Sequence, residues 1–155
     1  LNGLLYSCPG PVMVRKSRQE IGSGHYMENF TAAIICGFRA MAVILAYIMV
    51  FTIGINILDS SGVFSLFACE TASATLKGIL EMTIGVNLVG LCDTGIVTKT
   101  VTAAFLVSFG GLSVAGQAAS AAEGSGIGLG DILKIKATHG LISAVIAMIS
   151  GWFVL

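Results

Sequence analysis

Two long apolar stretches dominate the pattern of hydrophobic and polar positions along the chain. The first, 34–58, has Arg39 as its one charged residue; the second, 132–155, carries two lysines and a histidine near its start and no charge afterwards. A helix needs roughly 20 apolar residues to cross ~30 Å of hydrocarbon. Neither stretch keeps the polar face that an amphipathic helix turns toward water. The pattern therefore predicts transmembrane helices at 27–58 and 132–155.

The region 62–91 is apolar but is interrupted by charges and glycines. Glu70, Lys77 and Glu81 lie among its apolar residues, and three glycines follow Lys77. Glycine is a poor helix former, so a uniform helix is not expected there. The pattern predicts a return crossing that is broken or tilted, followed by a polar turn at 92–100.

The segment 101–122 is long enough to cross a membrane, but Gly110 and Gly111 lie side by side at its midpoint. Paired glycines allow the backbone to open. Cytoplasmic loops are enriched in lysine and arginine, and a full crossing would separate Lys99 from Lys134 and its neighbouring lysine. We therefore expect a glycine-broken re-entrant helical hairpin, which is tolerated where it is buried in protein or lines a cavity. A full crossing is the alternative.

The N-terminal residues set the expected orientation and domain division. Three basic residues place the loop 15–24 in the cytoplasm. The apolar residues before that loop are too few to span a membrane, and a signal peptide would carry its charges before them. We expect 1–26 to be the tail of a preceding helix plus the loop, and 27–155 to be a transmembrane domain. The predicted fold class is an all-α, polytopic integral protein of the cell membrane. We expect the chain to be the C-terminal part of a longer protein.

Composition supports a membrane protein and excludes several other classes. Apolar residues make up 55% of the chain and charged residues 10%, whereas soluble domains carry about 25% charged residues. The net charge is zero and no basic run points to nucleic acid. The four cysteines lack paired metal-ligand spacing, and no Ser/His/Asp set or phosphate loop occurs. We therefore expect that the protein is not an enzyme and has no catalytic residue, metal site or cofactor. We expect the lipid bilayer to surround it.

Glu81 is the strongest single candidate for a functional residue. A carboxylate in a transmembrane segment costs at least about 2.5 kcal/mol to insert, so it usually faces a cavity, a partner or an ion path. The functional interpretation is a solute-binding or proton-carrying carboxylate. The alternative is a structural ion pair with Lys77, which precedes Glu81 by four residues on the same helix face.

The glycine pair and the polar residues near it form the second candidate site. At a hairpin tip, free backbone N–H groups of Gly110 and Gly111, with the Ser113 hydroxyl and the Gln117 amide, would bind a small polar solute. The alternative is close helix packing through small residues. Asn87 is a further solute-binding candidate, or else forms a hydrogen bond between helices. Together with Glu81, these residues are the predicted site.

Three segments resemble one family. The run Gly-Ile-Leu-Glu-Met-Thr-Ile-Gly at 78–85 is similar to the Leu-Glu-x-Thr-x-Gly segment of YlbJ-type sporulation integral membrane proteins. The run Ser-Phe-Gly-Gly-Leu-Ser-Val-Ala-Gly-Gln at 108–117 resembles their Phe-Gly-Gly-Leu-Ser-Val-x-x-Gln motif. The run Lys-Ala-Thr-His-Gly-Leu at 136–141 stands where the family has a basic residue and a histidine before its final helix.

The resemblance implies a nucleoside-recognition, or Gate, membrane domain, as in nucleoside and ferrous iron transporters. It implies that 109–117 is a re-entrant hairpin, that Glu81 lies on an adjacent broken helix, and that the two share a solute. It also implies a role in endospore formation, and packing against an absent N-terminal half or a second subunit. The leading hypothesis is a transporter or permease component of unknown solute. A structural or assembly protein of sporulation, or an ion or ferrous iron permeation module, is the alternative.

Overall fold

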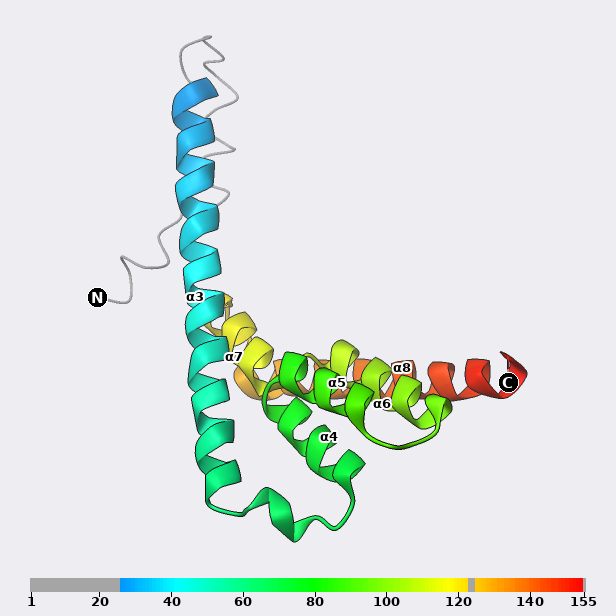
Figure 1. The fold of residues 1–155 in the computed structure, drawn as a ribbon. Coiled ribbons are helices and arrows are strands. Elements are labelled where there is room, and N and C mark those ends of the chain that lie inside the picture. Colours follow the sequence, from blue (N-terminus) through cyan, green and yellow to red (C-terminus); the bar gives the residue numbers. More distant parts are fainter. Residues whose placement is uncertain (1–25, 123–124, 155) are drawn as a thin grey trace. The chain divides into compact units, whose positions relative to one another are not determined.

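The computed structural model describes residues 26–122 and 125–154, and this part of the chain is helical without strands (Figure 1). The predicted all-α fold is therefore confirmed. The elements are α3 (Tyr26–Ser60), the short 3-10 helix η1 (Phe64–Leu66), α4 (Glu70–Leu80), α5 (Met82–Leu91), α6 (Ile96–Phe109), α7 (Gly111–Ala121) and α8 (Leu129–Val154). The expected cytoplasmic loop 15–24 lies outside the described residues.

Within the described residues, three stretches are long and apolar enough to cross a membrane: Asn29–Ser60 in α3, Ile96–Ala121 over α6 and α7, and Leu129–Phe153 in α8. The helix predicted at 27–58 is confirmed. The last helix begins earlier than the predicted residue 132. Its start is fixed by Gly128, whose carbonyl accepts hydrogen bonds from the amides of Asp131 and Ile132.

The chain forms two compact units, 1–45 and 46–155. Within the second unit, α4 and α5 fold back on one another as a helical hairpin whose tip is Glu81. Gly78 and Gly85 touch main chain to main chain, and a Cβ added to Gly85 would also lie 3.1 Å from the Ala74 carbonyl oxygen. Residues without side chains allow this approach. The segment predicted as a broken return crossing is indeed broken, but it turns back rather than crossing.

Helix α6 runs antiparallel to α8. A Cβ added to Gly151 would lie 3.2 Å from Val97 Cγ1, and one added to Gly140 would lie 3.0 Å from the Phe105 ring. The start of α6 therefore packs against the C-terminal part of α8, and the later residues of α6 pack against residues nearer the start of α8. It follows that Lys99 lies toward the C-terminal end of α8, away from Lys134, so the expectation that these lysines share one end is wrong.

The break at Gly110 and Gly111 is confirmed, but the hairpin expected there is wrong. Both glycines have left-handed φ angles, +79° and +74°, which end α6 and begin α7 in a new direction. Within the described range 96–122, α6 and α7 do not pack along each other, whereas both pack against α8. Two left-handed residues bend the path, while the extended Glu81 lets α5 return along α4. The helical hairpin of this fold is α4–α5.

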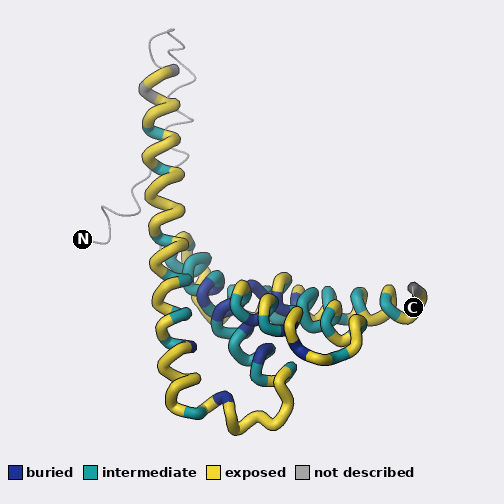
Figure 2. The backbone as a smooth tube through the Cα atoms, in the orientation of Figure 1, coloured by how far each residue is buried: buried dark blue, intermediate teal, exposed yellow. Residues whose placement is uncertain are grey.

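The buried core lies in the α4–α7 region (Figure 2). Ala74, Val89, Cys92 and Leu106 form one cluster, and the Leu106 methyl groups fill the space above Gly78. By contrast, α3 and α8 expose large apolar side chains, such as Phe38 and Trp152, which are 74% and 86% accessible. Faces of this kind are typical of helices that meet lipid or another membrane segment.

Candidate functional site

Glu81 occupies the single extended residue between α4 and α5. Its φ and ψ are −139° and 113°, and it is the N-cap of α5, where its Oε2 accepts a hydrogen bond of 2.8 Å from the Ile84 amide. The residue is only 1% exposed. A carboxylate at a helix N-terminus satisfies free N–H groups and interacts favourably with the helix dipole. The chain therefore stabilises a buried carboxylate at the hairpin tip.

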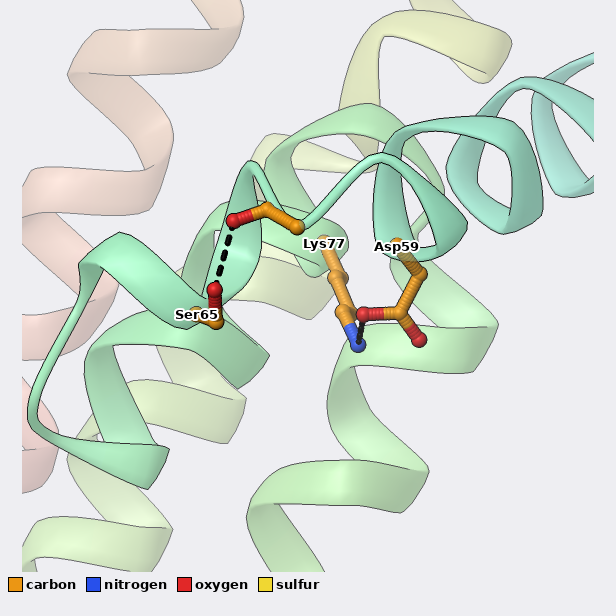
Figure 3. A network of polar contacts seen from close by, with 4 residues as sticks. Asp59, Ser65 and Lys77 are labelled. Carbon is orange, nitrogen blue, oxygen red and sulfur yellow. Dashed lines mark hydrogen bonds and ion pairs between the residues drawn. The ribbon is translucent and has the colours of Figure 1, made fainter.

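The ion pair considered between Glu81 and Lys77 is not formed. Lys77 Nζ instead lies 2.9 Å from Asp59 Oδ1 and 4.8 Å from the centre of the Phe64 ring (Figure 3). In the segment that connects α3 to α4, the Ser65 hydroxyl donates a hydrogen bond to the Gly62 carbonyl oxygen. Lys77 thus joins the end of α3 to α4, and Glu81 is left without a cationic partner among the described residues.

The glycine break lies directly on the hairpin tip. A Cβ added to Gly111 would be 3.0 Å from the Met82 amide nitrogen, 3.2 Å from the Gly78 carbonyl oxygen and 3.3 Å from that of Leu80. Both breaks in this part of the chain, the extended Glu81 and the left-handed glycine pair, therefore meet. The structure brings together Glu81, Gly110 and Gly111, as the sequence predicted for a shared site.

Two polar side chains of α7, the helix that begins at this break, lack hydrogen bonds. Ser113 is completely buried, and neither its Oγ nor Nε2 of Gln117 has a partner. The two residues are four positions apart and so lie on one face of the helix. Buried polar groups are normally paired, so these two atoms are available to a bound molecule.

Asn87 does not join this group. It is exposed on α5, while Gly85 and Val89 of the same helix are buried. A helix turns by about 100° per residue, so Asn87 lies on a different face from the residues that meet the hairpin core. The structure therefore separates Asn87 from the other predicted site residues.

Lys136 of α8 is a site residue that the sequence reasoning missed. A Cβ added to Gly110 would lie 3.1 Å from its Nζ, and Lys136 forms no ion pair with any described carboxylate. Its sequence position indicates only a cytoplasmic charge at the start of the last helix and the basic residue of the family resemblance. The available signal was Gly140, four residues later on the same helix face, where the absence of a side chain admits the Phe105 ring.

Tyr47 is a second neighbour that the sequence did not reveal. Its hydroxyl lies 2.7 Å from Ser120 Oγ, and a Cβ added to Gly116 would be 2.8 Å from the tyrosine ring. The C-terminal part of α3 is thereby attached to α7. In the described residues, no group of three His, Cys, Asp or Glu side chains is arranged to hold a metal ion.

No known protein family, curated protein or solved structure matches this chain. Function is therefore inferred from the geometry of the two breaks and from the sequence resemblance described above.

Proposed function

We propose that this chain is part of a membrane transport protein and that a small polar solute binds where the two helix breaks meet. The observation that carries this proposal is the contact of Gly111 with the hairpin tip that bears buried Glu81. The unpartnered polar atoms of Ser113 and Gln117 on α7 support it. Interrupted helices that meet inside a membrane protein offer main-chain groups and helix-end charge to a solute. A closed structural core would use the cap at Glu81 and the packing of Gly111, but not the unpartnered polar atoms of Ser113 and Gln117.

The energetic cost of the arrangement supports a functional role. A charged side chain at membrane depth costs at least about 2.5 kcal/mol, and an unpaired buried polar group costs about 1–3 kcal/mol. Glu81 is a buried carboxylate, and Ser113 and Gln117 each carry a buried polar atom without a partner, so all three carry such costs. A bound solute that donates to Glu81 and accepts from the other two side chains would offset them.

The resemblance to YlbJ-type proteins supports a role in endospore formation, with the cell membrane as the location. Under this proposal, the correspondence with a Gate domain differs from the one expected from the sequence. Glu81 belongs to the hairpin 70–91, and Gly110 with Gly111 belongs to the bent helix 96–121. A carboxylate hairpin and a broken helix are both present, in exchanged positions along the chain. The exposed apolar faces of α3 and α8 suit lipid, an absent half or a second subunit.

A structural or assembly protein of sporulation is the second candidate function. The observation that favours it is the close main-chain packing at Gly78, Gly85 and Gly111, since small residues also serve helix association alone. Under this alternative Glu81 caps α5 and binds nothing else. Loss of its charge would then leave the phenotype of the cell unchanged.

Uptake into proteoliposomes separates the two candidates. The panel contains nucleosides, amino acids, small carboxylates, inorganic phosphate and ferrous ion, each tested with wild-type protein and with Glu81→Ala. The transport proposal predicts that at least one solute enters above the level of empty liposomes, and that Glu81→Ala reduces its uptake at least tenfold. Thr83→Ala, an exposed position on α5, is the matched control and should retain uptake. Uptake that is equal in wild type and Glu81→Ala, or absent for the whole panel, would contradict the proposal.

A further inference from the structure

The first turn of α7 offers hydrogen-bond donors without acceptors. The first N–H groups of a helix, here those of Gly111, Leu112 and Ser113, have no acceptor inside the helix. Gly110 precedes them and supplies no capping side chain, and none of the three donates in the backbone hydrogen bonds that the described residues form outside their helices. The N-terminus of α5 differs, because the Glu81 carboxylate accepts a hydrogen bond there. The positive end of the α7 dipole thus has no capping side chain at the break, and the Gly78 and Leu80 carbonyl oxygens are the acceptor atoms nearest to Gly111 there.

Side chains around this end are donors as well. Ser113 is in the first turn of α7, and its hydroxyl is fully buried and unpartnered. The Cα–Cβ bond of a helical residue tilts toward the N-terminus of its helix, which for Ser113 is the side of the break. Nε2 of Gln117 lies one turn further along without an acceptor. Lys136 brings an ammonium group to Gly110 from α8.

A charge imbalance follows from this arrangement. Lys136 is only partly exposed and has no carboxylate within ion-pair distance among the described residues. An uncompensated ammonium at membrane depth is costly. A negatively charged group bound beside Gly110 would accept hydrogen bonds from the helix N-terminus and from Ser113, and would neutralise Lys136 at the same time.

We propose that the Gly110–Gly111 break is an anion-binding site, which holds a carboxylate or phosphate group of the solute between Lys136, Ser113 and the first turn of α7. This deepens the proposed function and rests on it, because it assigns the solute to the class of anions and zwitterions. Glu81, at the hairpin tip that meets Gly111, then binds the hydrogen-bond donors or the cationic group of the same solute. A neutral solute would leave Lys136 uncompensated.

Direct binding of two simple anions tests the proposal. Purified protein in nanodiscs is titrated with radiolabelled inorganic phosphate and, separately, with radiolabelled acetate, at constant ionic strength in chloride. Saturable binding of either probe is expected, and the probe that binds more tightly identifies the phosphate or the carboxylate class. Lys136→Met should weaken that binding at least tenfold, Ser113→Ala about threefold or more, and Lys136→Arg less than threefold.

Lys134→Met is the matched control, since Lys134 is an exposed lysine of the same helix that lies 3.7 Å from Asp131; its binding should equal that of wild type. If Lys136→Met does not fold, as judged by its thermal unfolding, Ser113→Ala and Lys136→Arg carry the test. Absence of saturable binding of both probes, or equal binding by wild type, Lys136→Met and Ser113→Ala, would overturn the anion site. Uptake that depends on Glu81 without anion binding would refute only this inference, whereas anion binding without uptake would refute the transport proposal.

Discussion

Gly111 and Met82 touch through their main chains: a Cβ added to Gly111 would lie 3.0 Å from the amide nitrogen of Met82. This contact joins the bend of α6–α7 to the tip of the α4–α5 hairpin. Because the hairpin backbone at the tip is itself held by Gly78 and Gly85, neither side has a flexible side chain that can move away. Glycine is therefore required at position 111 for two reasons: there is no room for a Cβ atom, and the φ angle is left-handed.

Gly111→Ala should destabilise the protein more than a matched change at Gly126. Both glycines have positive φ, +74° and +82°, which costs a non-glycine residue about 1–2 kcal/mol. A Cβ on Gly126 would meet nothing within 4 Å, whereas one on Gly111 would meet the hairpin backbone. We expect Gly126→Ala to lose only the backbone cost and Gly111→Ala to lose about 2 kcal/mol more. Thermal unfolding in detergent measures both, and equal losses would show that the contact is not formed.

Gly85→Ala should open the α4–α5 hairpin, because the added methyl group would overlap the main chain of Gly78. Gly90→Ala, on the same helix with nothing within 4 Å, is the control. We expect a loss of several kcal/mol for Gly85→Ala, and no loss or a gain of up to about 1 kcal/mol for Gly90→Ala. Spin labels at Ser73 and Leu88 would report the opening as an increased distance. An unchanged distance in Gly85→Ala would rule out tight packing of this pair.

The apolar pattern predicted the long helices well, because length and composition alone decide whether a helix can cross a bilayer. It also located the break at Gly110 and Gly111, and it predicted an interrupted region at 62–91 without placing that break at Glu81. It did not predict which break reverses the chain. That depends on backbone angles at Glu81 and Gly110 and on packing between Gly78 and Gly85, and neither is encoded by the local apolar pattern.

The enrichment of lysine and arginine in cytoplasmic loops led to a wrong topology prediction for a related reason. It grouped Lys99 with Lys134 by sign, although Lys99 Nζ donates to the carbonyl of Gly90 at the end of the hairpin. A lysine with a local structural partner carries little information on topology. Lys136 was missed in the same way, because its partner region at Gly110 is distant in the sequence.

The revised arrangement predicts which ends of the helices face the outside. If 15–24 is cytoplasmic, then Ser61 and Lys99 face the outside and Lys134 faces the cytoplasm. In a Cys69→Ser background, an impermeant maleimide applied to intact cells should label Ser61→Cys and Lys99→Cys but not Lys134→Cys. The background protein alone serves as the blank. Protection of Lys99→Cys together with labelling of Ser61→Cys would restore the re-entrant arrangement of 101–122.

Cys69 should react with maleimides at lower pH than an ordinary exposed cysteine. It is exposed at the start of α4, where the backbone of Ala72, and then that of Thr71, lowers the pKa of its thiol by stabilising the thiolate. The reactive thiolate therefore accumulates at lower pH. The control is Ala68→Cys in a Cys69→Ser background, since residue 68 is also exposed but precedes the helix start. Identical pH profiles of the labelling rates for the two thiols would contradict the prediction.

The accessibility of Ser113 tests the central claim, that a polar solute reaches the point where the two breaks meet. Ser113→Cys in reconstituted membranes is treated with a small, charged methanethiosulfonate reagent. Ala115→Cys is the control, because Ala115 is equally buried on α7 but apolar. Our account predicts that the cysteine at 113 reacts, that the one at 115 does not, and that the transported solute slows the reaction at 113. Failure of both cysteines to react would mean a dry structural core and would contradict the account.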